Sequence, residues 1–599
     1  MNKFNRHLWK QFWEIARPYW FSDDKWKARG MLVLLGILLL GQTEFNVLLN
    51  EQTGEFTSAL AAKDADRFWY AIKYCLFILI VAVPIYAFYY YVRDKLAVNW
   101  RQWITHKYLD NYFSNRAYYK LVSNAEIDNP DQRIAEDINT FTQRSLYFFL
   151  IIIGEILQLV AFSSVLWTIS KSLVFFLIIY AIAGTVITLV FFGKVLIGLN
   201  FYQLKREADF RFSLIRIREN AESIALYRGE EQESAHVKKR FHEAFLNYCK
   251  LIKWQLNLNL FQYAYSFLTI ILPSAIIASQ VLSGELEVGR AIQAAGAFAA
   301  ILSALAVIVD NFESLSRFFA GIDRLSTFSK SLNVQVSGKP SARQKKNAVI
   351  HSVQDSRLSL ENLTLQTPDY KRTLITNLTL EIKAGESLLI VGASGEGKSS
   401  LLRALAGLWD SGSGIIVRPS VEDMLFLPQH PYMILGNLRS QLLYPNTIGP
   451  HTIVPNAIGS NTIVSGAAKK EDHGKDRKVS DDELYRLLDS VNLPHLAERL
   501  GGLNADLDWG KVLSVGEQQR LAMARVLLSQ PRYVMLDEAT SALDTENEDS
   551  LYRQLMETAT TLVSISHRET VLKYHHHVLE LTGHGNWQLH AAKDFTFKS

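Results

Sequence analysis

Cysteine is scarce in this sequence. Cys75 and Cys249 are the only two among 599 residues, and they stand far apart. Two isolated thiols exclude a disulfide framework and a cysteine-rich metal site, because each of these needs several cysteines at close spacing. The soluble part of the chain therefore suits a reducing compartment.

A large excess of one charge is also lacking. The formal net charge of +4 is small for this length, since 63 Lys and Arg residues face 59 Asp and Glu residues. No long basic tract is present, which disfavours nucleic acid as a partner. Charged residues make up only 20% of the chain, whereas hydrophobic residues reach 49% and are unevenly spread. This imbalance indicates a membrane part joined to a soluble part.

The first 28 residues lack the pattern of a cleaved signal peptide, which is a short apolar core followed by small residues. They instead interleave Trp, Phe and Tyr with Lys and Arg. Such a pattern is typical of a helix that lies in the membrane interface, and an ordinary amphipathic surface helix is the alternative. Residues 1–28 are therefore expected to form an interfacial elbow helix.

Long apolar runs, in contrast, are abundant. A helix needs about 20 residues to cross a hydrocarbon layer of about 30 Å. Six runs meet that length, near residues 30–50, 71–92, 146–168, 173–198, 257–281 and 288–310. The sequence therefore predicts an all-α transmembrane domain with six spans over residues 29–328.

The distribution of Lys and Arg predicts the orientation of these spans. Most of the basic residues between spans fall in the two long loops, residues 93–145 and 199–256. Basic loops stay on the cytoplasmic side, so both loops and both termini are expected there. The loops are strongly helix-patterned and should continue the spans as long helices.

A second domain is expected after a linker. Residues 329–357 lose the apolar period and gain Ser, Lys and Gly, which is typical of a linker. From residue 358 to residue 599, short apolar runs alternate with helical stretches, as in an α/β sheet domain. A near-repeat followed by a charged run predicts a low-complexity insertion, a mobile loop, at about 446–478.

A glycine-rich segment of the second domain predicts a phosphate-binding loop. It follows an apolar run and precedes a helical stretch, which is the strand, loop and helix setting that such a loop requires. Its backbone N–H groups can turn toward phosphates, and the next helix adds the positive end of its dipole. Lys398 would contact the β- and γ-phosphates, and the Ser399 hydroxyl would ligate Mg²⁺. The candidate nucleotide contacts are Gly392, Ala393, Ser394, Gly395, Glu396, Gly397, Lys398, Ser399 and Ser400.

A buried-strand pattern at 533–538 ends in two acids. Asp537 could hold Mg²⁺ through its water shell, and Glu538 could polarise an attacking water as general base. Taken alone, this motif could also be an acid-capped strand, and the glycine-rich loop could be a structural turn.

Together with further motifs, these residues resemble the ABC ATPase family over about 358–590. Residues 513–518 are similar to the family's signature sequence, Gln429 to its Q-loop, 541–544 to its D-loop, and His567 to its switch histidine. The resemblance implies an α/β P-loop ATPase that binds ATP and Mg²⁺. It also implies catalytic roles for Glu538, His567 and Gln429, metal contacts from Ser399, Gln429 and Asp537, and nucleotide contacts from Ser514, Gly516 and Glu517.

Two positions depart from the family pattern. Val515 replaces a glycine of the signature, whereas the flanking Ser514 and Gly516 are kept. Thr367 and Pro368 occupy the place of the aromatic residue that stacks on adenine, so Tyr370 is the nearest candidate for that contact.

The membrane half narrows the resemblance. Residues 129–137, 207–211 and 218–227 are similar to motifs of the SbmA/BacA-like and peroxisomal subfamily D branch, although solvated charged helices are the alternative. The resemblance implies a half-transporter with the exporter-type fold. The signature of one cassette then completes the ATP site of another, so a second copy or a related half-transporter is the expected partner in the lipid bilayer. A multi-pass protein of a bacterial inner (plasma) membrane, with a cytoplasmic ATPase domain, is expected.

The expected function is ATP-driven uptake of a hydrophilic solute such as cobalamin or a peptide. A fatty acyl-CoA transporter and a non-transporting ATP-dependent regulator of a membrane partner are the alternatives. Polar groups are costly against lipid, so those inside the spans are expected to face a wet interior. These groups are Gln42, Glu44, Asn46, Glu155 and Gln158.

Overall fold

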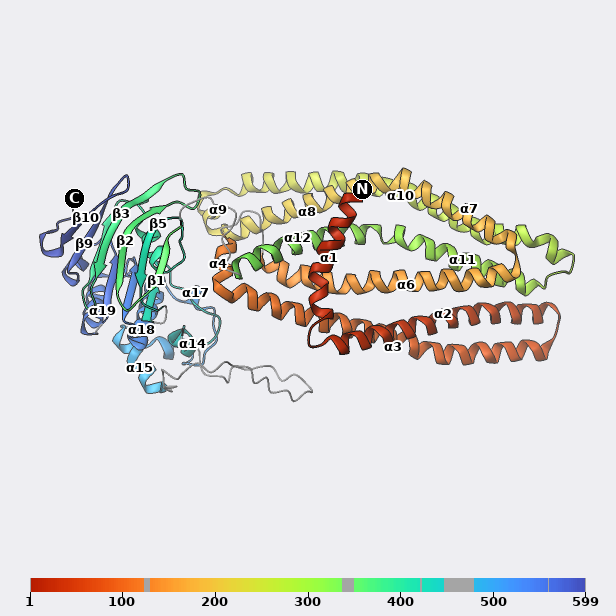
Figure 1. Cartoon of the computed structure of the whole chain (residues 1–599), viewed down its shortest axis with the longest axis horizontal. Helices are drawn as coiled ribbons and strands as arrows, with labels where there is room; N and C mark the ends of the chain where they lie inside the picture. Colours follow the sequence, from red (N-terminus) through yellow and green to blue (C-terminus); the bar gives the residue numbers. More distant parts are fainter. Residues whose placement is uncertain are drawn as a thin grey trace. The chain divides into compact units, whose positions relative to one another are not determined.

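The computed structural model describes residues 2–122, 130–336, 349–420, 423–445, 479–558 and 560–597. The chain divides into two compact units, Met1–Lys339 and Pro340–Ser599, and each is described by itself (Figure 1). The insertion predicted at about 446–478 lies outside the described residues.

The first unit is built from long helices (Figure 1). The main ones are α1 (Asn2–Trp20), α2 (Lys25–Ala61), α3 (Ala65–Phe113), α6 (Ile138–Ile169), α7 (Lys171–Ile187), α8 (Lys194–Glu219), α10 (Glu230–Leu282), α11 (Val288–Asp310) and α12 (Phe312–Val336). Short helical segments join them, namely η1 (Ser114–Arg116), α4 (Ala117–Val122), α5 (Pro130–Gln132), η2 (Arg133–Asp137), η3 (Thr188–Gly193) and α9 (Ala221–Tyr227).

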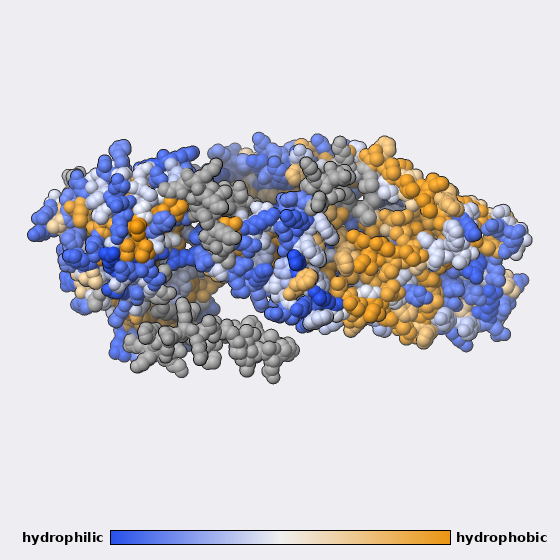
Figure 2. All heavy atoms as spheres, in the orientation of Figure 1, coloured by the Kyte–Doolittle hydropathy of each residue, from blue (hydrophilic) through white to orange (hydrophobic). Residues whose placement is uncertain are grey.

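Among the described residues of this unit, six helical stretches are long and apolar enough to cross a membrane, which confirms the six predicted spans. Apolar side chains gather in a broad belt over these helices (Figure 2). Helices α3 and α10, with 49 and 53 residues, run well beyond the apolar runs predicted within them. The expectation that the long loops continue the spans as helices is therefore confirmed.

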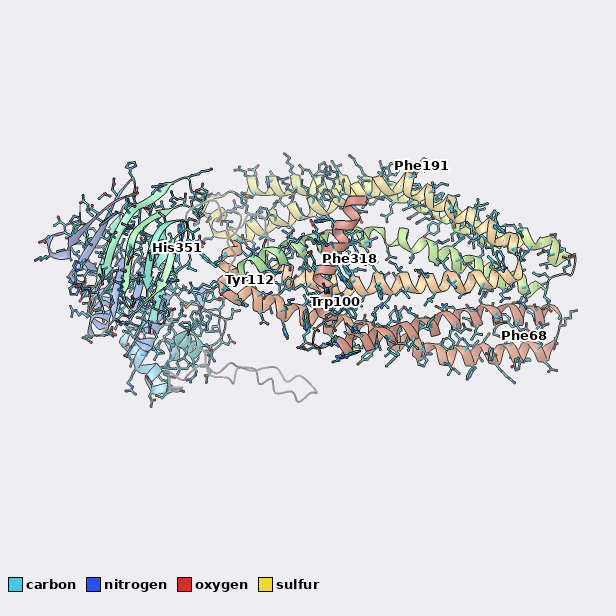
Figure 3. The ribbon with its side chains drawn as sticks, viewed as in Figure 1. Phe68, Trp100, Tyr112, Phe191, Phe318 and His351 are labelled. Atoms are coloured by element: carbon cyan, nitrogen blue, oxygen red, sulfur yellow. The ribbon has the colours of Figure 1, made fainter. Side chains whose placement is uncertain are left out.

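Aromatic packing holds the N-terminal helix against the bundle. Tyr19 of α1 stacks on Trp100 of α3 with ring centroids 5.6 Å apart, and Trp100 meets Phe141 of α6 edge to face. Phe318 of α12 stacks on Phe141 from another direction, and Figure 3 shows Trp100 and Phe318 close to this crossing. Buried aromatic side chains contribute most to such a core because each covers a large apolar area.

A buried ion cluster ties η2 to α12. The Asp137 carboxylate pairs with Arg133 at 3.0 Å and with Arg324 at 2.9 Å. The side chains of Arg133 and Asp137 are only 7% and 8% exposed, so solvated charged helices do not explain this part of the subfamily-like motif. A buried carboxylate needs such partners, because an unpaired charge away from water is costly.

The second unit contains two sheets. The smaller one has the strand order β1-β5-β2-β3, formed by β1 (His351–Gln354), β5 (Gly412–Arg418), β2 (Leu358–Gln366) and β3 (Thr373–Ile382). The larger one has the order β10-β9-β4-β8-β7-β6, formed by β10 (Asn586–Ala591), β9 (His577–Gly583), β4 (Leu388–Gly392), β8 (Thr561–Ile565), β7 (Tyr533–Asp537) and β6 (Met424–Leu427). All its neighbouring strands pair in parallel, except β10 with β9.

Helices complete this unit. They are α13 (Lys398–Leu405), α14 (Leu438–Leu443), α15 (Asp481–Ser490), α16 (Leu496–Arg499), α17 (Trp509–Val512), α18 (Val515–Ser529) and α19 (Thr545–Glu557). Two buried apolar clusters contain residues from the central strands of the large sheet. A parallel sheet is normally covered on both faces, which explains why its strands are continuous apolar runs in the sequence. The predicted fold class, a six-helix membrane domain followed by an α/β domain, is confirmed.

Regular structure enters the predicted linker from both sides. Helix α12 continues to Val336, and β1 occupies His351–Gln354 within the 329–357 segment. Each extension has a tertiary partner, since α12 packs against α1 and β1 pairs with β5. The sequence pattern of residues 329–357 does not show these partners, so it predicted a linker where tertiary contacts stabilise regular structure.

The expectation that all polar groups of the spans face a wet interior is wrong for Gln42. This side chain is buried in α2, on a helix that packs against α3, α6 and α11. Asn46 is half-buried and accepts a hydrogen bond from the Tyr86 hydroxyl of α3 at 2.8 Å. The neighbouring helix α3 thus satisfies Asn46 inside an apolar layer. A water-facing position for Glu155, which is half-buried in α6, stays a prediction.

Candidate functional site

Four predicted motifs follow four adjacent strands of the large sheet. The glycine-rich loop follows β4, His567 follows β8, Asp537 ends β7 with Glu538 directly after it, and Gln429 follows β6. These strands are parallel, so their carboxyl ends lie at one edge of the sheet, where α/β proteins bind ligands. Residues that are up to 175 positions apart in the sequence are thereby brought together.

The glycine-rich loop has the backbone that a phosphate cradle needs. Gly392, Gly395 and Gly397 have φ values of 147°, 85° and 101°, which residues with a Cβ atom rarely adopt. A Cβ atom at Gly392 would lie 2.6 Å from the Leu581 carbonyl oxygen of β9, so this position has no room for one. Three residues of the loop are exposed and thus open to a ligand, namely Ala393, Ser394 and Gly395. The following helix α13 begins at Lys398.

Lys398 places a positive charge over the loop. Its ammonium donates to the carbonyl oxygens of Gly392 at 2.8 Å and Ala393 at 3.0 Å, and the residue is 7% exposed. Burial lowers the pKa of Lys398, while Glu538, Asp537 and Glu396 act in the opposite sense. A buried ammonium that donates to neutral carbonyl oxygens is suited to anionic phosphate oxygens.

Ser399 and Asp537 form a pair of oxygen donors at the start of α13 and the end of β7. The Ser399 hydroxyl donates to Asp537 at 3.0 Å. Burial raises the pKa of Asp537, against the effect of the Ser399 hydrogen bond. A hydroxyl and a carboxylate are hard oxygen ligands, so this pair fits Mg²⁺.

Glu538 is held between two other predicted catalytic residues. Its carboxylate accepts a hydrogen bond from the Gln429 amide at 2.8 Å and lies 3.4 Å from Nε2 of His567. The backbone of Glu538 is left-handed, with φ of 49°, and its N–H donates to the Ile565 carbonyl oxygen of β8. A non-glycine residue in this conformation is strained, and such strain is concentrated at functional sites.

The signature residues begin helix α18. Ser514 caps the helix, and Ser514 and Glu517 exchange hydrogen bonds in a capping box. Arg499 holds the other oxygen of Glu517 at 2.6 Å, and Gly516 lies against the Ala542 carbonyl of the D-loop segment. In the described part of the chain, no hydrogen bond or ion pair joins these signature residues to the loop at 392–400.

The structure shows a connecting residue that the sequence did not reveal. The Gln519 side chain is 1% exposed and bonds to the Gln429 carbonyl at 3.2 Å, to the Ser541 hydroxyl and to the Ala542 N–H at 3.0 Å. It therefore links the Q-loop-like and D-loop-like segments to α18. Gln519 directly follows the signature-like residues 513–518, and this position in the sequence could have indicated its role.

A second cluster missed in the sequence follows the switch-like histidine. Arg568 donates to the carbonyl oxygens of Ser541 and Leu543, each at 2.8 Å. Glu548 of α19 is 1% exposed, lies 3.5 Å from Arg568, and accepts hydroxyl hydrogen bonds at 2.7 Å from Thr540 and Thr570. Arg568 thus fixes residues 541–543 relative to His567.

The candidate adenine contact lies on the β2–β3 hairpin. Tyr370 is half-buried in the turn, with φ of 59°, and its N–H donates to Thr367. Arg372 of this hairpin lies 3.7 Å from Glu396 of the glycine-rich loop, and Leu374 of β3 packs against Gly397. The hairpin therefore borders the loop, which keeps Tyr370 as the candidate.

Comparison with known proteins matches both units. The model of the family "ABC transporter transmembrane region 2" matches residues 15–282, and the model "ABC transporter" matches residues 375–541. An uncharacterized ABC transporter ATP-binding protein of Synechocystis is 43% identical, over 94% of this chain and 81% of that protein. The chloroplastic ABC transporter D family member 2 of Arabidopsis thaliana is 40% identical, over 96% and 86%.

A third relative has a stated cargo. The human lysosomal cobalamin transporter of the D family is 30% identical, over 94% of this chain and 93% of that protein. The six apolar helices, the P-loop domain and these relatives agree with one another. The chain therefore belongs to the ABC transporter family, close to the D-family half-transporters, and is an integral membrane protein that binds ATP and couples its hydrolysis to transport.

Proposed function

We propose that the edge formed by β4, β8, β7 and β6 is the site of ATP hydrolysis, with Glu538 as general base. The main support for this proposal is the position of the Glu538 carboxylate, which accepts a hydrogen bond from the Gln429 amide at 2.8 Å and lies 3.4 Å from Nε2 of His567. Gln429 would orient the attacking water, Glu538 would accept its proton, and His567 would steady the γ-phosphate.

Residues of the glycine-rich loop hold the substrate in this proposal. The N–H groups from Ala393 to Ser400 bind phosphate oxygens, and Lys398 turns from its own loop carbonyls toward the β- and γ-phosphates. Ser399 and Asp537, with Gln429, would hold Mg²⁺, and the ion would supply positive charge that offsets the charge of the phosphates. Tyr370 stacks on the adenine.

We infer that two such chains act together, as a homodimer or with a related half-transporter. Ser514, Gly516 and Glu517 make no hydrogen bond or ion pair to the glycine-rich loop within the described residues, so they are available to another copy. The signature of each copy would complete the ATP site of the other. The bilayer surrounds the helical unit, and we place the protein in a bacterial inner membrane with its ATPase domain in the cytoplasm.

The proposed transport is uptake of a hydrophilic solute, with cobalamin or a peptide ahead of a fatty acyl-CoA. The relationship to the human lysosomal cobalamin transporter supports this order, as does the resemblance of residues 129–137, 207–211 and 218–227 to the SbmA/BacA-like branch. A regulator that gates a membrane partner without transport is the candidate from a different functional class.

Reconstituted protein should hydrolyse ATP faster when cobalamin or peptides are added, and should move the stimulating solute across liposomes only with ATP. The measurements are phosphate release and uptake of labelled solute in the same vesicles. Stimulation by long acyl-CoA alone would reverse the cargo order. Steady hydrolysis with no flux of any tested cargo would favour the regulator.

Replacing Arg568 by alanine should lower the hydrolysis rate about tenfold with little change in ATP affinity, since a small misplacement of catalytic groups is costly. The Ser541 and Leu543 carbonyls would lose their donor, and the buried Glu548 would lose its nearby cation. Phosphate release and nucleotide binding should be measured in parallel.

Arg553→Ala is the matched control for Arg568→Ala. Arg553 is 69% exposed and pairs with Asp549 within α19, so its loss should leave both quantities unchanged. If Arg568→Ala hydrolyses ATP as fast as the unchanged protein, then the hydrogen bonds from Arg568 to residues 541–543 do not position the catalytic groups.

A further inference from the structure

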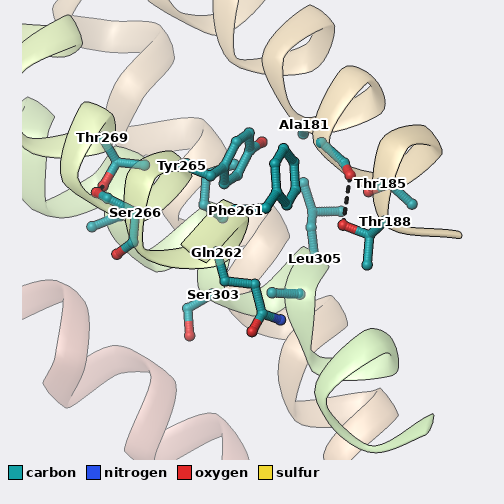
Figure 4. Close-up of a pocket in the computed structure, with 14 residues that line it drawn as sticks. Ala181, Thr185, Thr188, Phe261, Gln262, Tyr265, Ser266, Thr269, Ser303 and Leu305 are labelled. Atoms are coloured by element: carbon teal, nitrogen blue, oxygen red, sulfur yellow. Dashed lines mark hydrogen bonds between the residues drawn. The ribbon is translucent and has the colours of Figure 1, made fainter. Parts of the chain in front are cut away.

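A cavity of about 320 Å³ lies among three spans of the helical unit (Figure 4). Helix α7 and η3 form one wall, and α10 and α11 form the others (Figure 4). This volume is at the lower end of the range for sites that enclose a small molecule.

The lining is polar, and none of the described residues that form it carries a charged side chain. Its polar members are Thr185, Thr188, Gln262, Tyr265, Ser266, Thr269 and Ser303. The side chains of Thr185, Gln262, Ser266 and Ser303 make no hydrogen bond to other described residues. Polar groups without partners are costly within the apolar layer, so these groups are suited to water or to a polar ligand.

The shape of the cavity is fixed by a reciprocal tyrosine pair. The Tyr180 hydroxyl donates to the Tyr265 carbonyl at 2.7 Å, and the Tyr265 hydroxyl donates to the Tyr180 carbonyl at 2.8 Å. Their rings stack with centroids 4.2 Å apart. A Cβ atom at Gly184 would lie 2.5 Å from the Tyr265 ring, so this glycine allows α7 and α10 to approach. The polar groups therefore lie on two helices, α7 and α10, that this tyrosine pair holds together.

An adjoining groove shows that this polarity is local. The groove shares Ala181, Thr185 and Leu305 with the cavity. Apart from Ser163 and Thr185, its lining is aliphatic, as expected of a surface that meets lipid chains. The hydroxyl groups and the Gln262 amide are thus concentrated in the cavity and not in the adjoining groove.

We propose that this cavity binds an uncharged part of the cargo that is rich in amide or hydroxyl groups, with Gln262 as its main hydrogen-bonding contact. The inference rests on the proposed transport of a hydrophilic solute and deepens it. A phosphate-bearing head such as that of coenzyme A does not fit, because the described residues that line the cavity include no cation. Small neutral amides and polyols match both the volume and the donors and acceptors.

The test uses a dipeptide of serine and alanine that is acetylated at its N-terminus and amidated at its C-terminus. Ser303→Cys is introduced into the full chain with Cys75→Ala and Cys249→Ser, and the purified protein is labelled in lipid nanodiscs, without nucleotide, by a neutral hydroxyl-bearing thiosulfonate. The capped dipeptide should slow this labelling at least fivefold. The same dipeptide with free, charged termini should protect much less.

Controls separate the cavity from general effects. Ser283→Cys, exposed at the end of α10, should label without protection. Gln262→Leu should abolish the protection of Ser303→Cys, whereas Asn259→Leu, an exposed amide one turn earlier on α10, should retain it. Ser266→Cys repeats the measurement from α10 if Ser303→Cys does not fold.

Three results would overturn the proposal. These are cysteines that cannot be labelled at either cavity position, labelling that the capped dipeptide does not slow, and equal protection by the charged dipeptide. Since the labelling needs no ATP, it is independent of transport. Protection without any cargo-stimulated hydrolysis would refute the proposed transport of such solutes while leaving the ligand chemistry of the cavity supported.

Discussion

Glu538→Gln should reduce ATP hydrolysis by about 100-fold or more while ATP still binds, since a positioned general base contributes about 10²- to 10⁴-fold. Glutamine keeps the size of the side chain and can still contact Gln429 and His567, but it cannot accept the proton of the attacking water. The proposed phosphate contacts of Lys398 and Ser399 should be unaffected. The variant should therefore accumulate with ATP bound, in a dimer closed around the nucleotide.

The measurements are phosphate release and retention of labelled ATP by the purified protein. Glu546→Gln, at the start of α19, is a matched control because it removes an acid outside the site. It should hydrolyse ATP at the normal rate. Near-normal hydrolysis by Glu538→Gln would remove Glu538 from the role of base and reassign the proton to another group.

Lys398→Ala should lose ATP affinity by about 10- to 150-fold, which corresponds to the roughly 1.5–3 kcal/mol typical of hydrogen bonds to charged groups. The buried ammonium is the cation that this loop presents to phosphates, and alanine replaces it with an apolar methyl group. Hydrolysis at low ATP should fall in proportion. Equilibrium binding of a fluorescent ATP analogue measures the affinity directly.

Thermal unfolding without nucleotide distinguishes lost binding from lost folding in this variant. Lys383→Ala, at an exposed position between β3 and β4, is the control and should change neither quantity. Unchanged ATP affinity in a folded Lys398→Ala protein would contradict the assignment of the loop as the phosphate site.

The strand-edge site was predictable because its motifs are local. The glycine-rich loop, the Asp537-Glu538 pair and the apolar runs before them each occupy a short stretch, in which strand, turn and helix preferences agree. The six spans were predictable for the same reason, since span length and hydropathy are read from contiguous residues. The resemblance to a known family added Gln429 and His567, which carry no local signal of their own.

The rest depends on contacts between distant segments. Gln519 is one glutamine among several until the fold brings Gln429 and Ser541 to it. Arg568 and Glu548 lie 20 positions apart on different elements, and only the turn after β8 brings them within 3.5 Å. Gln42 was misplaced because hydropathy marks a polar residue as costly in lipid without showing the helix that covers it.

The left-handed backbone of Glu538 is strained, so the residue that the proposed chemistry needs at this position is not the one that would make the fold most stable. A glycine at this position would relieve about 1–2 kcal/mol of steric strain, because only glycine adopts this conformation freely. It would also remove the carboxylate. With Glu538 as the proposed base, a substitution that stabilises the cassette at this position would therefore also inactivate it.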